Sequence, residues 1–235
     1  MPTKNVRRAL VLGTGAAAML IPATAGAQTR AQSPSATQAA PVHVFRDDLT
    51  PVGNNPPADA KAFLIRRPDS LTAVIVGLHL SPDVPHAIHI HGELQAANEC
   101  PTAAADQNGD GLVDTLEGLP SYGPIDTTFT TSGGTSGGLG PDALDLSRAP
   151  VANAGGVLVY QRTIPIKDTV APGEEGIPRA VADDLAHLHI VVHGADLNAN
   201  GKYDFGPGTS SLSTVVGAPV PLEAELPVAC GKIQG

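Results

Sequence analysis

Histidine recurs at alternate positions in two short apolar segments that lie far apart in the chain. Residues 85–92 read Pro-His-Ala-Ile-His-Ile-His-Gly, and residues 187–193 read His-Leu-His-Ile-Val-Val-His. Successive side chains of an extended strand point to opposite faces, so His89 and His91 share one face, about 7 Å apart along the strand. Imidazole is the commonest metal ligand among side chains. The pair therefore predicts half of a metal site.

The second segment repeats this alternation. His187 and His189 share a strand face with His193. Residues four positions apart in a strand are separated by roughly 13 Å, too far for easy binding of one ion. His187 and His189 are thus candidates for a separate, weak metal site, and ordinary structural histidines are the alternative.

Residues 106–117 match the twelve-residue calcium-binding loop throughout. Oxygen ligands fall at positions 1, 3, 5, 9 and 12, and a main-chain carbonyl falls at position 7. These ligands are Asp106, Asn108, Asp110, Asp114 and Glu117, with the carbonyl of Leu112. Gly111 stands at position 6, where the turn requires it. The sequence predicts a loop stapled by calcium, and a metal-free Asp/Asn turn is the alternative.

A second loop repeats the first nine positions of this pattern, from residue 196 to residue 204. Its ligands would be Asp196, Asn198, Asn200 and Asp204, with the main-chain carbonyl of Lys202. Position 12 is Pro207, so the loop itself lacks the bidentate carboxylate. A second, weaker calcium site and an empty turn are equally compatible with this sequence.

The elements expected to position these residues are short strands. Apolar alternation and β-prone runs predict strands over 43–49, 60–67, 70–80, the segment ending at 91, 125–131, 143–151, 156–166, 187–193, 221–226 and 228–233, with a helical turn over 181–185. Seven to nine short strands with many Gly and Pro residues indicate an all-β sandwich or barrel. We expect one such domain over residues 42–235.

The first 27 residues are typical of a secretory signal. Three basic residues precede the apolar run 9–21, and Ala25-Gly26-Ala27 provides a cleavage site near Ala27. The apolar run is too short to span a membrane. Residues 28–41 are polar and rich in Ala and Pro, which predicts a flexible linker. We therefore expect a secreted, periplasmic or extracellular protein.

Charge and cysteine content exclude some partners and predict a disulfide. The formal net charge is −9, and it becomes −12 once the signal is removed, because that segment holds three basic residues and no acidic one. This charge argues against nucleic acid and anionic membranes as partners, and is compatible with metal cations. The two cysteines, Cys100 and Cys230, are expected to pair in an exported chain, with two free buried thiols as the alternative.

Four short motifs resemble the copper/zinc superoxide dismutase superfamily. They are residues 85–91, the segment Asn-Glu-Cys-Pro-Thr at 98–102, the strand Ile-Val-Val-His at 190–193 and the closing strand Pro-Val-Ala-Cys-Gly-Lys-Ile at 227–233. Residues 45–92 are also similar to a chordin-type (CHRD) domain, which ends strands in a comparable His-Ile-His-Gly.

This resemblance implies an eight-stranded Greek-key β-barrel of superoxide dismutase type with long loops. It further implies that three histidines bind copper, that a fourth histidine supports the copper ligands without binding the metal, and that the cysteines form the internal disulfide. The residues concerned are His89, His91 and His193 for copper, His86 as the support, and Cys100 with Cys230.

The sequence also departs from that family. No histidine lies between residues 92 and 186, so the bridging histidine and the zinc ligands are missing. Pro227 stands where the family places the arginine that draws superoxide to the metal. Three imidazoles can still hold copper, or zinc, with an open position. Two functions remain: a copper-binding redox protein acting on superoxide or peroxide, and a non-enzymatic, calcium-stabilised binding module with a degenerate metal site.

Overall fold

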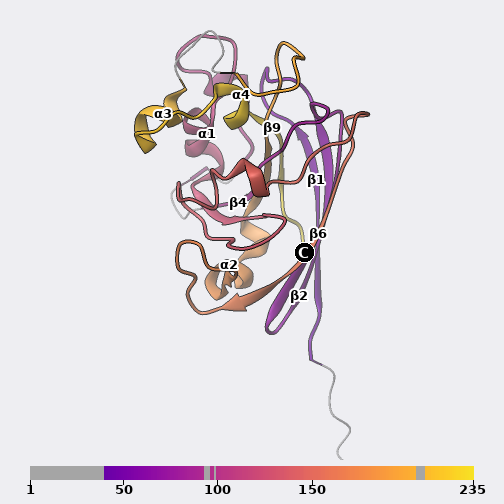
Figure 1. Ribbon diagram of the computed structural model, residues 1–235. Coiled ribbons are helices and arrows are strands. Elements are labelled where there is room, and N and C mark those ends of the chain that lie inside the picture. The colour runs from indigo at the N-terminus through magenta and orange to yellow at the C-terminus, as the bar shows by residue number, and fades with distance from the viewer. Residues whose placement is uncertain (1–39, 93–95, 98, 205–209) are drawn as a thin grey trace, which may run out of the picture. The chain divides into compact units, whose positions relative to one another are not determined.

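Nine β-strands form one mixed sheet that closes almost into a barrel (Figure 1). The computed structural model describes residues 40–92, 96–97, 99–204 and 210–235. The strands are β1 (His43–Pro51), β2 (Asp59–Arg67), β3 (Ser70–Leu78), β4 (Ile88–His91), β5 (Ile125–Thr128), β6 (Leu158–Lys167), β7 (Ile177–Pro178), β8 (His189–His193) and β9 (Pro227–Lys232). Their order in the sheet is β5-β4-β8-β9-β1-β2-β3-β6-β7, and the predicted all-β class is confirmed.

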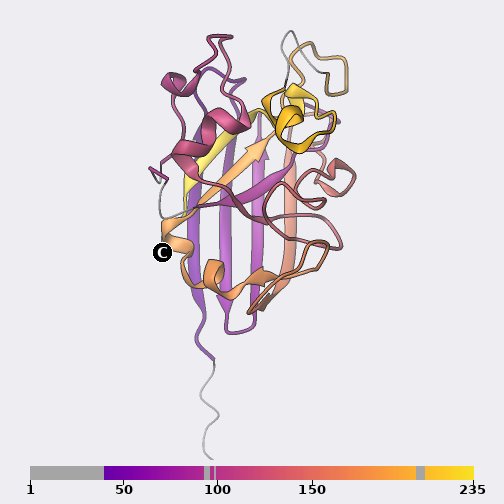
Figure 2. The same cartoon turned by 90° about the vertical axis from the view of Figure 1, so that its left-hand side faces the viewer.

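Strand pairing is antiparallel except between β6 and β7, which are parallel. Strand β3 pairs with β6 and not with β4, its successor in sequence, so the connection crosses over as in a Greek key. Strands β1, β2, β3 and β6 lie side by side in one layer (Figure 2). Strands β4, β5, β8 and β9 form the part of the sheet that carries the histidines.

Few helices accompany the sheet, and all are short. They are α1 (Thr115–Tyr122), α2 (Arg179–Asp183), α3 (Ser211–Val216) and α4 (Leu222–Glu225), with 3₁₀ turns at Ala103–Ala105, Leu146–Arg148 and Leu185–His187. Helices α1, α3 and α4 gather at one end of the barrel (Figures 1 and 2). Among the described residues, none of the helices has the length and apolar character needed to cross a membrane.

The core lies inside the barrel and is built from aliphatic side chains on alternate strand positions. In β4 and β8, Ile88 lies opposite Val192 and Ile90 lies opposite Ile190, and all four side chains are buried in this core. The strand period of two then places the histidines of both strands on the outer face. Every residue of β4 and β8 is nevertheless buried, because loops and helices cover that outer face.

Two predicted strands are wrong. Residues 143–151 form turns and a 3₁₀ turn. The Asp145 side chain accepts a hydrogen bond from the Ser147 amide and forms an ion pair with Arg148, and both contacts favour the turn. Residues 221–226 contain helix α4 instead, where Leu-Glu-Ala-Glu are good helix formers. His187 lies in a 3₁₀ turn ahead of β8 rather than in the strand. The remaining strand predictions agree with the structure within a few residues.

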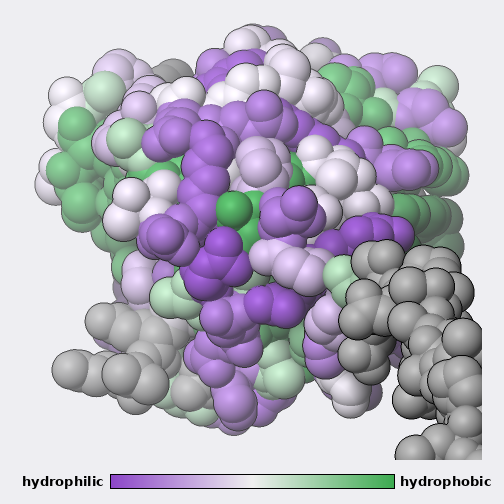
Figure 3. Space-filling model, turned by 90° about the horizontal axis from the view of Figure 1, so that it is seen from below, coloured by the Kyte–Doolittle hydropathy of each residue, from purple (hydrophilic) through white to green (hydrophobic). Residues whose placement is uncertain are grey.

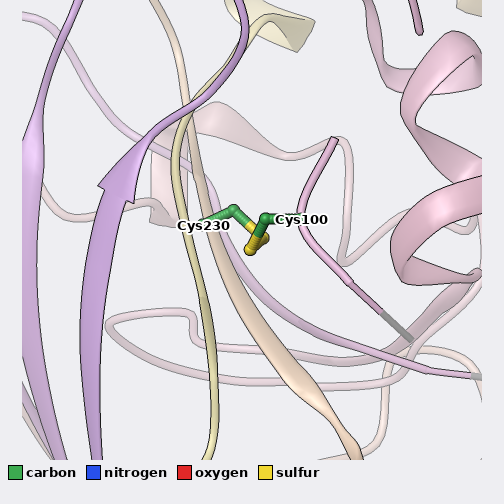
Figure 4. The surroundings of a disulfide bond; sticks show 2 residues. All are labelled: Cys100 and Cys230. Atoms are coloured by element: carbon green, nitrogen blue, oxygen red, sulfur yellow. A yellow bond between two sulfur atoms is a disulfide. The ribbon is translucent and has the colours of Figure 1, made fainter. Parts of the chain in front are cut away.

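A disulfide joins Cys100 to Cys230 and confirms the predicted pair (Figure 4). Cys230 belongs to β9, and Cys100 precedes the first calcium-type loop. The bridge packs in a small apolar cluster with Val113, Tyr122 and Val191. It therefore ties the covering loop and α1 to the outer face of the sheet.

The predicted signal peptide and most of the predicted linker fall within residues 1–39 and lie outside the described residues.

Seen from below the view of Figure 1, the molecule presents mostly hydrophilic residues with scattered apolar ones (Figure 3).

Removing the disulfide should cost much of the stability. Its sequence separation of 130 residues gives about 4 to 5 kcal/mol in the chain-entropy model. We expect the variant Cys100→Ala/Cys230→Ala to lose roughly that amount in the free energy of unfolding, measured with denaturant. A reducing agent should lower the stability of the wild type and leave the variant unchanged. Equal stability of the two proteins would contradict this account.

Candidate metal centre

Three histidines from β4 and β8 converge on the outer face of the sheet. The side chains of His89, His91 and His193 each offer a nitrogen, and these nitrogens lie within 4.8 Å of one another. In the part of the chain that the structure describes, this is the one group of three or more His, Cys, Asp or Glu side chains placed so closely. A single ion that bonds nitrogen at about 2 Å requires only small shifts of the rings.

Strand pairing brings these residues together from distant parts of the sequence. Strand β4 is paired with β8, which sets His91 opposite His189 and His89 opposite Val191. The pairing of β8 with β9 shifts register between Val192 and His193. Such β-bulges are common next to functional sites, where they change the direction of a side chain. The backbone amide of His193 then donates to the carbonyl of Ala87, 2.8 Å away, which fixes the end of β8 beside β4.

Each of the three rings has one nitrogen facing a main-chain carbonyl. His91 Nδ1 lies 2.8 Å from the carbonyl oxygen of Gly123, and His193 Nδ1 lies 2.9 Å from that of Glu225. His89 Nε2 lies 3.3 Å from the carbonyl oxygen of Ala143. A carbonyl only accepts hydrogen bonds, so each of these nitrogens carries the proton.

The other nitrogen of each ring is buried and has no hydrogen-bond partner. These atoms are His89 Nδ1, His91 Nε2 and His193 Nε2. Burial lowers the pKa of His91 to about 3 and that of His193 to about 4, and it lowers the pKa of His89 well below the ordinary value. The rings are therefore neutral, and each presents a lone pair. A proton held by a carbonyl on one nitrogen and a lone pair on the other is the usual state of a metal-binding histidine.

The three carbonyls come from three segments outside the strands of the triad. Gly123 ends α1 with φ of +83°, a conformation that favours glycine and that directs its carbonyl to His91. The Glu225 carbonyl, at the end of α4, also accepts the Thr115 hydroxyl of α1 at 2.6 Å. Helices α1 and α4 are thus fastened to each other where they orient two of the rings.

The third carbonyl, that of Ala143, is held by a buried ion pair. Its neighbour Asp142 is almost fully buried and accepts Arg148 Nη2 at 2.7 Å and the Ser136 hydroxyl at 2.5 Å. Burial acts to raise the pKa of Asp142, but the Ser136 and Arg148 hydrogen bonds hold it below its ordinary value. The carboxylate therefore stays charged and ties the Gly-rich loop 132–140 to the segment that follows it.

The other histidines play different parts. His86 is fully buried, and its two ring nitrogens lie 3.0 Å from the carbonyl oxygens of His193 and Ser81. Burial lowers the pKa of His86, so the neutral ring donates its one N–H to one of the two carbonyls. His86 therefore packs against the backbone of a triad residue and turns both nitrogens to carbonyls rather than to the triad. His189 is buried across from His91 in the neighbouring strand, and it is not part of the triad. His187 is exposed and contacts Asp184.

Tyr122 at the end of α1 closes another side of the triad. Its ring centroid lies 4.4 Å from that of His91, and its hydroxyl donates to the carbonyl of Thr115 at 3.0 Å. No sequence pattern pointed to Tyr122, because helix α1 was not predicted.

The first calcium-type loop folds around its own carboxylates. Asp106 accepts the amides of Gly109 and Gly111, and Glu117 accepts those of Gln107, Asn108 and Asp114. Asp114 caps α1, so the loop leads directly into the helix that orients His91. Among the residues that the structure describes, the acidic side chains of neither calcium-type loop come together in a group of three within 4.8 Å.

The second loop receives a carboxylate from elsewhere in the chain. Asp196 accepts the amides of Asn200 and Gly201, at loop positions 5 and 6, whereas Asp106 accepts those of positions 4 and 6 in the first loop. Glu223 of α4 is buried and accepts the amides of Leu197 and Asp204, positions 2 and 9 of the loop.

In the first loop Glu117 accepts the amides of the same two positions, Gln107 and Asp114. Glu223 therefore takes the place of the position-12 carboxylate, which the second loop itself lacks. Sequence reasoning missed Glu223, because it follows the loop only after Pro207 and an intervening segment.

Comparison of the chain with models of protein families finds no matching family, and comparison with curated proteins finds no significant match.

Proposed function

We propose that the protein binds one copper ion through His89 Nδ1, His91 Nε2 and His193 Nε2. The observation that supports this proposal is the set of three buried, unpartnered nitrogens, each on a ring whose other nitrogen faces a carbonyl. For nitrogen ligands Cu(II) stands above Zn(II) in the usual order of affinity. The resemblance to the copper/zinc superoxide dismutase superfamily points to the same ion.

The rest of the chain would hold this site rigid and dry. A bound copper ion would supply one-electron redox chemistry. The three carbonyls fix the rings, and the triad's near-complete burial excludes water from its nitrogens. We propose export from the cell as well, since a disulfide is typical of oxidising compartments.

Rapid dismutation of superoxide is not what this site favours. Pro227 occupies the place of the family's anion-attracting arginine, and the described part of the chain carries a negative formal charge. Without that arginine, and with a negative net charge, the chain is less able to steer an anion toward the metal. We therefore propose a redox role in which superoxide dismutation is at most a slow side activity.

Copper loading tests the proposal directly. We expect wild-type protein dialysed against copper to retain one ion per chain by elemental analysis. Either His91→Ala or His193→Ala should weaken binding by more than about 100-fold, since even loss of a supporting group costs 10- to 100-fold.

The exposed His187 offers a matched control, and His187→Ala should retain the copper. Circular dichroism would confirm that each variant is folded. Absence of bound copper in the wild type would reject the redox role and leave a calcium-stabilised binding module, similar to a CHRD domain, as the function.

We also propose that both loops bind Ca²⁺ as structural ions. The matching twelve-residue pattern of residues 106–117 supports the first site. The placement of Glu223 on the same two amide positions supports the second. Calcium in these loops would stabilise α1 and α4, the helices whose carbonyls orient His91 and His193.

Calcium should raise the melting temperature of the protein, and calorimetry should count two ions per chain. An ion present at about 100 times its dissociation constant contributes about 2.7 kcal/mol. Glu117→Gln and Glu223→Gln should each remove one ion, because each loses the bidentate carboxylate, whereas the exposed Glu99→Gln should retain both. Equal melting temperatures in calcium and in chelator would contradict both sites, and two ions in Glu223→Gln would contradict the role of that residue.

A further inference from the structure

An apolar pocket of about 350 Å³ adjoins the histidine triad. The rings of His89 and His193 form part of its wall. Most of the rest comes from three stretches that are distant in sequence: the loop 139–146, helix α3 with the segment 218–221, and α4. The wall is completed by Ala87, Thr115 and Ile125. A pocket assembled from separate segments against the candidate metal ligands is the usual setting of a small-molecule site.

The pocket wall is aliphatic and carries no positive charge. Leu139, Leu144, Leu212 and Val216 are among its lining residues, and no Lys or Arg lines it among the described residues. Glu225 is the one acidic residue in the wall, and its carboxylate oxygens are shielded from solvent. An anion placed here would lose its hydration and gain no cationic partner in the wall, which is costly.

Volume sets the size of the occupant. A dry apolar cavity of about 150 Å³ in another protein binds benzene. The pocket described here therefore has room for a substituted ring or a molecule of similar bulk. It is too small for a folded partner, and its concave wall differs from the flat surface that a protein interface needs.

We propose that this pocket binds a small, neutral organic molecule with an apolar body, held against the rings of His89 and His193. The inference rests on the proposed metal site and names the class of substrate that the site would receive. A molecule in this pocket would be held by apolar contact and not by charge.

Benzyl alcohol and benzoate are matched probes, because they share a ring and differ in charge. Titrations of the metal-free protein, followed by the methyl NMR signals of Leu144 and Leu212, should show saturable binding of benzyl alcohol. Benzoate should bind about tenfold more weakly or worse, because the wall offers no compensation for its charge.

Two neighbouring valines provide the matched variants. Val216 lines the pocket, whereas Val215 is 59% exposed and does not line it. Val216→Phe should fill the pocket and weaken benzyl alcohol binding by about tenfold or more, while Val215→Phe should bind it as the wild type does. Both variants should keep one copper per chain, which shows that the triad is intact.

Equal binding of benzoate and benzyl alcohol, or unchanged binding in Val216→Phe, would overturn the inference. The copper measurement separates the two proposals. Saturable binding of benzyl alcohol without copper binding would remove the redox role and leave the pocket, and copper binding without benzyl alcohol binding would remove only the pocket's proposed occupant.

Discussion

The candidate centre depends on three hydrogen bonds from imidazole rings to main-chain carbonyls. Gly123, Ala143 and Glu225 each accept the proton of one histidine and so decide which nitrogen is left with its lone pair. A buried nitrogen without a partner is costly, and three of them pointing to one place are difficult to explain in a protein that binds nothing there. The cost is offset if an ion satisfies all three lone pairs together.

Much of the structure outside the barrel serves to hold those carbonyls. The first calcium-type loop leads into α1, which ends at Gly123, and the second is joined through Glu223 to α4, which ends at Glu225. The ion pair of Asp142 with Arg148 holds the segment that contains Ala143. The disulfide fastens the start of this covering layer to β9. The covering layer therefore sets the chemistry of the histidines, and the barrel sets their spacing.

Sequence reasoning reached the barrel part of this arrangement, because alternation of apolar side chains is a local signal. His89 and His91 could be placed on one face from their spacing alone, whereas His193 required the resemblance to a known family. The alternation in β3 marked a strand without showing that Leu71, Ala73 and Ile75 form its buried side. The carbonyl partners, Glu223 and the apolar pocket could not be predicted, since each depends on tertiary contacts between segments with no shared pattern.

The protonation state of the three rings tests this account most directly. Long-range ¹H–¹⁵N correlation spectra of metal-free protein at neutral pH should show neutral rings, with the proton on Nε2 of His89 and on Nδ1 of His91 and His193. Added Cu(I), which is diamagnetic, should then shift the three bare nitrogens together at one equivalent of ion. Charged rings, or protons on the nitrogens assigned to the metal, would contradict the account.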